Sequence, residues 1–204
     1  FIIFKKIIMA YDSFKVLRSS AVPLPIENVD TDQIIPARFL KATERKGFGD
    51  NLFRDWRYDK NDQAKSDFIL NNPTYSGKIL VGGKNFGSGS SREHAAWAIY
   101  DYGFRCVVSS FFADIFRGNS INVGILPVQV SPEFLHQIFT AMEKNPKAEL
   151  EVSLPEQTIT IVSTGASESF EINGYKKNNL LNGFDDIDYL QSMKGEIATF
   201  ALNR

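Results

Sequence analysis

Short apolar runs alternate with amphipathic segments through the middle of this 204-residue chain. The runs at 78–81, 105–109 and 124–130 have the length and aliphatic content of buried strands. Each run is followed by a segment with helical spacing, at 91–102, 111–119 and 131–144. This order predicts parallel strands that are joined by right-handed helical crossovers.

The pattern changes toward the C-terminal end. Residues 149–154 and 158–163 alternate apolar and polar positions, and a proline-containing turn joins them, which predicts a hairpin. A further strand is predicted at 169–173 and a helix at 185–194. Near the start we expect a short strand at 14–17, a connection at 19–28 and a short helix at 36–41. Together the segments predict one α/β domain over residues 1–204, with a mixed sheet and flanking helices.

Two stretches depart from this regular pattern. Residues 41–77 mix charged, aromatic and amide side chains with weak periodicity, which predicts an elaborated loop region, and such loops are often functional. Residues 1–10 are apolar, but Lys5 and Lys6 interrupt them, so the run is too short to span a bilayer. Two interpretations stay open for residues 1–8: part of a first strand, or an extension that precedes a start at Met9.

Composition narrows the chemistry that the chain can perform. Its formal net charge of −1 gives no sign of a nucleic-acid-binding surface. The one cysteine, Cys106, lies in an apolar run, which excludes an internal disulfide framework and favours a reducing compartment. One thiolate does not hold an iron–sulfur cluster, and two histidines, His94 and His136, argue against a zinc site.

Candidate chemistry is concentrated at residues 86–94, with the sequence FGSGSSREH. A glycine-rich turn that opens a helix directs backbone N–H groups and the positive helix end at one spot, which suits an anion. Arg92 adds a forked cation that matches a carboxylate or a phosphate. The sequence therefore predicts a small-anion site beside a serine hydroxyl.

Other interpretations of these residues stay open. The lysine of a P-loop is missing after Gly87, and Arg92 stands where a dinucleotide fingerprint has its third glycine. Ser90 and Glu93 have the spacing of a helix capping box. Upstream, Asp30 and Asp32 would share one face of an extended segment, where they form a turn or orient a cation such as Arg92.

Five segments stand out for their order and spacing: 28–40, 86–94, 110–116, 124–127 and 180–187. They have the sequences NVDTDQIIPARFL, FGSGSSREH, SFFADIF, GILP and LLNGFDDI. Together they resemble the small subunits of 3-isopropylmalate dehydratase, an aconitase-related family, from about Met9 nearly to the end of the chain. The resemblance implies a swivelling β/β/α domain of the aconitase C-terminal type.

The resemblance also implies an activity and a role for each loop residue. The family interconverts 2-isopropylmalate and 3-isopropylmalate in leucine biosynthesis by removing and returning water. By this match Ser90 is the base, as an alkoxide, while Gly89, Ser91 and Arg92 hold the substrate carboxylate. Asp32 matches a second active-site acid, which we expect to orient cations or histidines. Relatives often have cysteine where Ser88 stands, a change that leaves these roles untouched.

The loop after residue 40 is implied to choose the substrate. Within residues 41–60, Phe48, Leu52, Phe53 and Trp56 are candidates to line an apolar pocket for an isopropyl group. Packing of these side chains onto the domain is an equally good interpretation. We expect this loop to be mobile in the chain by itself.

The implied cofactor and partner lie outside the chain. The resemblance implies a 4Fe–4S cluster on a separate large subunit, in agreement with the single cysteine, so we expect this chain to bind no metal or cofactor. We expect a heterodimer or a dimer of heterodimers in the cytoplasm, a small hydroxy dicarboxylic acid as substrate, and no contact with nucleic acid or membrane. Two alternatives stay open: a sister hydro-lyase for citraconate/methylmalate or homoaconitate-type acids, and a non-catalytic anion-binding module.

Overall fold

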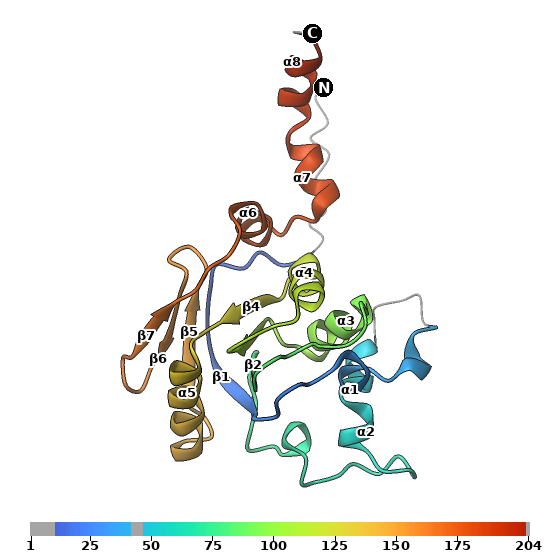
Figure 1. Cartoon of the computed structure of the whole chain (residues 1–204), viewed down its shortest axis with the longest axis vertical. Helices are drawn as coiled ribbons and strands as arrows, with labels where there is room; N and C mark the ends of the chain where they lie inside the picture. Colours follow the sequence, from blue (N-terminus) through green and yellow to red (C-terminus); the bar gives the residue numbers. More distant parts are fainter. Residues whose placement is uncertain (1–10, 42–46, 203–204) are drawn as a thin grey trace, which may run out of the picture.

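The computed structural model describes residues 11–41 and 47–202 (Figure 1). One seven-stranded sheet has the order β4-β3-β2-β1-β5-β6-β7. Its strands are β1 Val16–Leu24, β2 Ile79–Gly82, β3 Cys106–Ser109, β4 Leu126–Gln129, β5 Glu149–Ser153, β6 Thr158–Ile161 and β7 Ser167–Ser169. The α/β class with a mixed sheet is confirmed. The expectations for residues 1–8, and for 42–46 of the loop, lie outside the described residues.

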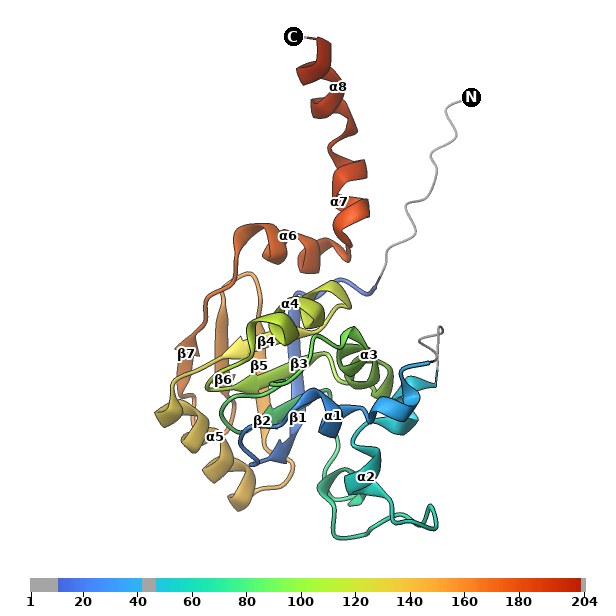
Figure 2. The ribbon, with the colours of Figure 1, turned by 45° about the vertical axis from the view of Figure 1, so that its right-hand side comes forward.

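Strand β1 joins a parallel half of the sheet to an antiparallel half (Figure 2). Its residues 16–20 pair antiparallel with β5, and residues 21–24 pair parallel with β2. The prediction of a short strand at 14–17 and a connection at 19–28 was wrong, because β1 continues through Pro23. Proline fits there because pairing with β5 ends at Ser20, so only one edge of β1 is hydrogen-bonded at Pro23.

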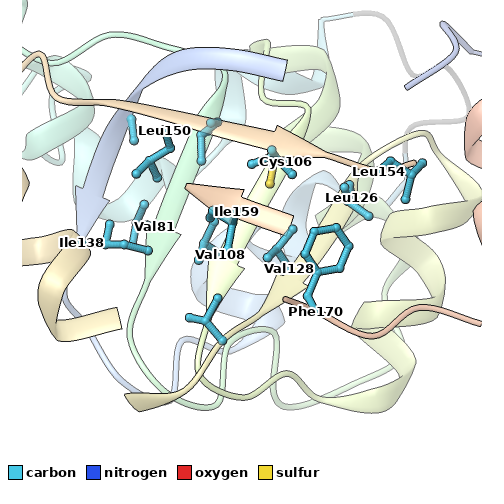
Figure 3. Packing of buried hydrophobic residues seen from close by; sticks show 14 of the residues in the cluster. Val81, Cys106, Val108, Leu126, Val128, Ile138, Leu150, Leu154, Ile159 and Phe170 are labelled. Atoms are coloured by element: carbon cyan, nitrogen blue, oxygen red, sulfur yellow. The ribbon is translucent and has the colours of Figure 1, made fainter. Parts of the chain in front are cut away.

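The parallel strands separate two hydrophobic cores. Val81, Cys106 and Val108 belong to one core, together with side chains of β5, β6 and helix α5 Pro132–Lys144 (Figure 3). Leu80 and Val107 belong to the other core. All five side chains are fully buried. Strands that are covered on both faces need no polar alternation, which is why continuous apolar runs identified them in the sequence.

The second core is covered by two short helices of four residues each and by two longer helices, of which α3 carries part of the site. These are α1 Thr31–Ile34, α2 Arg54–Arg57, α3 Glu93–Tyr102 and α4 Asp114–Asn122, with 3-10 turns η1 Ala37–Phe39, η2 Phe48–Asn51 and η3 Ile69–Asn71. The predicted helix at 111–119 is displaced to 114–122, because Phe112 forms a β-bridge with Phe86. The predicted start of α5 is confirmed, since the Ser131 side chain accepts a hydrogen bond from the Phe134 N–H at 3.1 Å.

The C-terminal helices extend away from the sheet (Figures 1 and 2). Helix α6 Gly174–Asn182 packs on the domain, whereas α7 Asp186–Ser192 and α8 Lys194–Leu202 project outward as an arm. At the base of the arm, Asp186 accepts a hydrogen bond from the Tyr175 hydroxyl at 2.7 Å, which lowers the pKa of that carboxyl. The predicted helix at 185–194 is confirmed as α7, and the strand predicted at 169–173 lies earlier, as β7.

Candidate active site

The glycine–serine loop, residues 86–92, connects the carboxyl end of β2 with α3. Open sheets with parallel strands bind ligands at this edge. The loop lies beside the segment that precedes α1, where Asp30 and Ser88 form a parallel bridge. The Gly87 N–H donates to the Val29 carbonyl at 2.7 Å, and the Thr31 N–H donates to the Ser88 carbonyl at 2.8 Å. These backbone bonds join two of the sequence motifs into one site.

Two glycines give the loop its backbone path. Gly87 and Gly89 have φ angles of 79° and 93°, in the left-handed region that other residues rarely occupy. A Cβ atom on Gly87 would also lie 2.1 Å from Cγ of the buried Phe116, whereas one on Gly89 would meet only ordinary contacts. Gly87 therefore fixes the loop against α4, and Gly89 turns the chain so that the following residues are exposed.

Helix α3 begins at Glu93, two residues later than predicted. Arg92 is its cap residue and no side chain caps the helix, so the capping box expected from Ser90 and Glu93 is wrong. The Arg92 N–H instead donates to the Ser90 carbonyl at 2.8 Å, and the Thr31 hydroxyl donates to the same carbonyl at 3.0 Å. The backbone of Ser90 is thus held in place, while the side chains of Ser90 and Ser91 are exposed beside the start of the helix.

Arg92 lies between this loop and α1. Its Nη1 atom forms an ion pair with Oδ1 of Asp32, and the Arg92 side chain is only 19% exposed. The prediction that Asp30 and Asp32 share one face was wrong. Asp30 caps α1 and accepts a hydrogen bond from the Gln33 N–H at 2.8 Å, and Asp32 lies inside that helix. The ion pair limits the rotamers of the guanidinium, so the structure brings Asp32 and Arg92 together next to the serines.

The candidate specificity loop packs against α3. The Gly49 N–H donates to Oδ2 of Asp101 at 2.8 Å, and the Phe48 ring lies 5.5 Å from the His94 ring. Phe48, Leu52 and Phe53, three of the candidates for a substrate pocket, are 3%, 0% and 0% exposed and are buried in the domain. The alternative of packing onto the domain is the correct one for these three side chains. Mobility of the loop stays a prediction.

Sequence reasoning missed Arg57, which holds this loop together. It is 8% exposed, and its Nη1 atom donates to the carbonyls of residues 49, 50 and 52 at 3.5, 3.4 and 3.3 Å. Its Nε atom donates to Oδ1 of Asn71 at 3.1 Å, and the guanidinium lies 4.9 Å from the Tyr102 ring centroid. The only signal in the sequence is an arginine between two aromatic residues, Trp56 and Tyr58.

The described residues do not form a metal site. Within residues 11–41 and 47–202, no group of three or more histidine, cysteine or acidic side chains is placed to hold a metal ion. Cys106 is buried in β3, and burial raises the pKa of its thiol, so the thiol stays protonated. This chain therefore does not fit an iron–sulfur cluster. None of the helices in the described ranges is long and apolar enough to cross a membrane.

Comparison with known proteins agrees with the fold and the loop. Residues 11–133, more than half of the chain, match the family described as the aconitase C-terminal domain, and residues 136–174 match one described as LeuD_N. The sheet, the glycine–serine loop and these matches define a domain of the aconitase C-terminal type. The swivel-domain class that the resemblance implied is confirmed.

Individual relatives show which family within this class the chain belongs to. The 3-isopropylmalate dehydratase small subunit of Cytophaga hutchinsonii is 64% identical over 93% of this chain and 94% of the relative, and that of Christiangramia forsetii is 59% identical over 95% and 94%. A crystal structure of 3-isopropylmalate dehydratase from Methanocaldococcus jannaschii has a TM-score of 0.67 and 26% identity, over 90% of this chain and 98% of that one. The chain belongs to the family of 3-isopropylmalate dehydratase small subunits.

Proposed function

We propose that this chain is one half of a hydro-lyase that interconverts 2-isopropylmalate and 3-isopropylmalate in leucine biosynthesis. The observation that carries the proposal is the grouping of Gly89, Ser90, Ser91, Arg92 and Asp32 at the start of α3. This set combines an anion-binding helix start, two hydroxyls and an oriented guanidinium. Names of relatives up to 64% identical support the choice of reaction and imply a large-subunit partner.

Substrate binding would use the positive groups of the site. The Arg92 fork, the Ser91 hydroxyl and the backbone at Gly89 would hold one carboxylate of the substrate. Asp32 would keep the Arg92 side chain in its present rotamer through the ion pair. We therefore give Asp32 a positioning role and do not assign it a proton transfer.

Ser90 is proposed as the base. Dehydration removes a proton from the carbon next to a carboxylate, and negative charge develops on that carboxylate, where Arg92 stabilises it. The hydroxyl group on the adjacent carbon leaves with its bonding electrons, and a Lewis acid held by the partner would accept it. A serine hydroxyl gives up its proton only if nearby cations stabilise the alkoxide in a site without bulk water. Ser90 is exposed in this chain, so another polypeptide must cover it. The proposed mechanism thus requires a partner on physical grounds.

The remaining parts of the proposal concern that partner and the whole chain. A 4Fe–4S cluster is assigned to the large subunit, since the one cysteine of this chain is buried in β3. We propose that residues 1–204 act as a single swivel domain and that 41–60 select the substrate through side chains other than Phe48, Leu52 and Phe53. A cytoplasmic location is supported by the single reduced thiol.

Reconstitution with the large subunit of the same organism tests the proposal. The mixed complex, assembled without oxygen, is assayed on 3-isopropylmalate, on citraconate/methylmalate and on a homoaconitate-type acid. We expect turnover of 3-isopropylmalate with kcat/KM at least about tenfold above the other acids. A preference for another acid would reassign the substrate. Tight binding of small anions without turnover of any of these acids would contradict the enzyme assignment and indicate a non-catalytic anion-binding module.

A further inference from the structure

Large hydrophobic side chains that are exposed gather in two places on the described part of the chain. Four lie on the α7–α8 arm: Ile187, Leu190, Phe200 and Leu202. Three others lie at the carboxyl edge of the parallel strands: Ile26, Phe111 and Ile115, with exposed fractions of 38%, 47% and 56%. Among the side chains that the structure describes, which exclude those of residues 196–198, only Val16 lies apart from both groups. Apolar side chains that gather beside a polar site indicate a contact surface.

Hydrogen bonds place Ile26 and Phe111 on neighbouring loops. The Gly83 N–H donates to the Ile26 carbonyl at 3.1 Å, and the Ser109 hydroxyl donates to the carbonyls of Gly83 and Phe111 at 2.7 and 2.9 Å. The Phe86 N–H, at the start of the glycine–serine loop, donates to the Phe111 carbonyl at 3.0 Å. The loops that follow β1, β2 and β3 therefore lie side by side, next to the candidate active site.

Ile115 extends this surface along α4. It lies in the first turn of that helix, directly before Phe116, whose ring packs against Gly87 of the loop. Phe116 is buried and Ile115 is exposed, so α4 turns one side chain toward the core and the next toward solvent. We call Ile26, Phe111 and Ile115 the apolar rim.

We propose that the apolar rim is where the large subunit docks on this chain. The inference rests on the proposed function, because the partner that must exclude water from Ser90 has to cover the same edge. A surface of this kind, with apolar side chains around polar groups that become buried, is typical of specific protein interfaces. Docking of the large subunit on the apolar rim would thus also exclude bulk water from Ser90.

A second copy of this chain is a poorer occupant of the rim. A two-fold interface places this edge of one copy against the same edge of the other, so both copies would bring the same polar and charged groups to it. Such a dimer would also cover the glycine–serine loop, but it would supply no group that this chain lacks. The large subunit adds the metal centre that the described residues of this chain do not provide.

Acidic substitutions in the rim test the proposal. Phe111→Asp and Ile115→Asp are each titrated against the purified large subunit by calorimetry, and Val16→Asp is the matched control. Val16 is 58% exposed but begins β1, at the end of that strand remote from the loop. We expect each rim variant to weaken the Kd at least about tenfold, and the control to stay within about twofold.

The outcomes separate this inference from the proposed function. Wild-type Kd values for both rim variants would overturn the docking surface, while isopropylmalate turnover by the wild-type complex would leave the function intact. Self-association of the isolated chain that Phe111→Asp abolishes would assign the rim to a second copy and overturn it as well. If Phe111→Asp unfolds, Ile115→Asp decides, because an acid in the first turn of α4 favours the helix.

Discussion

Gly87→Ala is the substitution that most directly tests how the fold positions the loop. Gly87 has a φ of 79°, and an L-residue in this region costs about 1–2 kcal/mol. The added Cβ would lie 2.1 Å from Cγ of Phe116, which is 2% exposed and packed 5.4 Å from the Phe86 ring. Overpacking of this kind costs about 1–3 kcal/mol, so the total loss of unfolding free energy is about 2–5 kcal/mol.

Urea and thermal unfolding of the isolated chain measure this loss. For a chain of this length, about 2–5 kcal/mol corresponds to a decrease in Tm of roughly 4–20 °C. Gly103→Ala is the control for backbone strain alone, because Gly103 has a φ of 119° but nothing within 4 Å of an added Cβ. Gly118→Ala, inside α4 and with open space, should instead raise stability by about 0.5–1 kcal/mol.

The clash itself is tested with a second substitution. Phe116→Ala removes the ring, whose Cγ is the atom nearest to the new methyl group, so the double variant Gly87→Ala/Phe116→Ala should lose less stability than the sum of the two single variants. Additive losses, or a Gly87→Ala variant as stable as Gly103→Ala, would refute the contact between this loop and α4.

Three further predictions concern the rest of the chain. Arg57→Lys removes the forked donor from the loop carbonyls, so it should lower the free energy of unfolding by about 1–3 kcal/mol and accelerate hydrogen exchange at residues 49–58. Unchanged exchange would contradict the role of Arg57 in holding this loop together. Cys106 should react with Ellman's reagent only after denaturation, because burial raises the pKa of its thiol; rapid labelling of the native chain would contradict its burial. The hydrogen bond from Arg38 lowers the pKa of Asp55, so this stabilisation is present at neutral pH and is lost as the pH falls through the lowered pKa. Both side chains are more than half exposed, so Asp55→Asn should cost less than about 1 kcal/mol at pH 7 and nothing at pH 2; a cost that persists at pH 2 would contradict this pairing.

The crossover strands and the hairpin were predictable because their patterns are local. Val81, Cys106 and Val108 lie in continuous apolar runs, which strands buried on both faces require. The cap at Ser131 was predictable for the same reason, since the serine and the helix that it caps are adjacent in sequence. The partner change of β1 was not predictable, because it depends on where β5 stops pairing.

The geometry of the candidate site was only partly predictable from the sequence. Orientation of Arg92 by an upstream aspartate was one of two interpretations that the sequence left open, and the ion pair of Asp32 with Arg92 is present. The role of Asp30 as a cap was missed because α1 has four residues, too few to show a helical period. The burial of Phe48 was also missed, since it depends on the approach of η2 to α3, which the sequence of either segment does not show.

The most direct test of the central claim is the turnover of a mixed complex that carries Ser90→Ala. Ser88→Ala, two residues earlier in the same loop, is the matched control for loss of a hydroxyl. The account predicts that Ser90→Ala binds the large subunit with the wild-type Kd and lowers kcat by a factor on the order of 10² to 10⁴, while Ser88→Ala remains active. Wild-type turnover by the Ser90→Ala complex would contradict the assignment of the base.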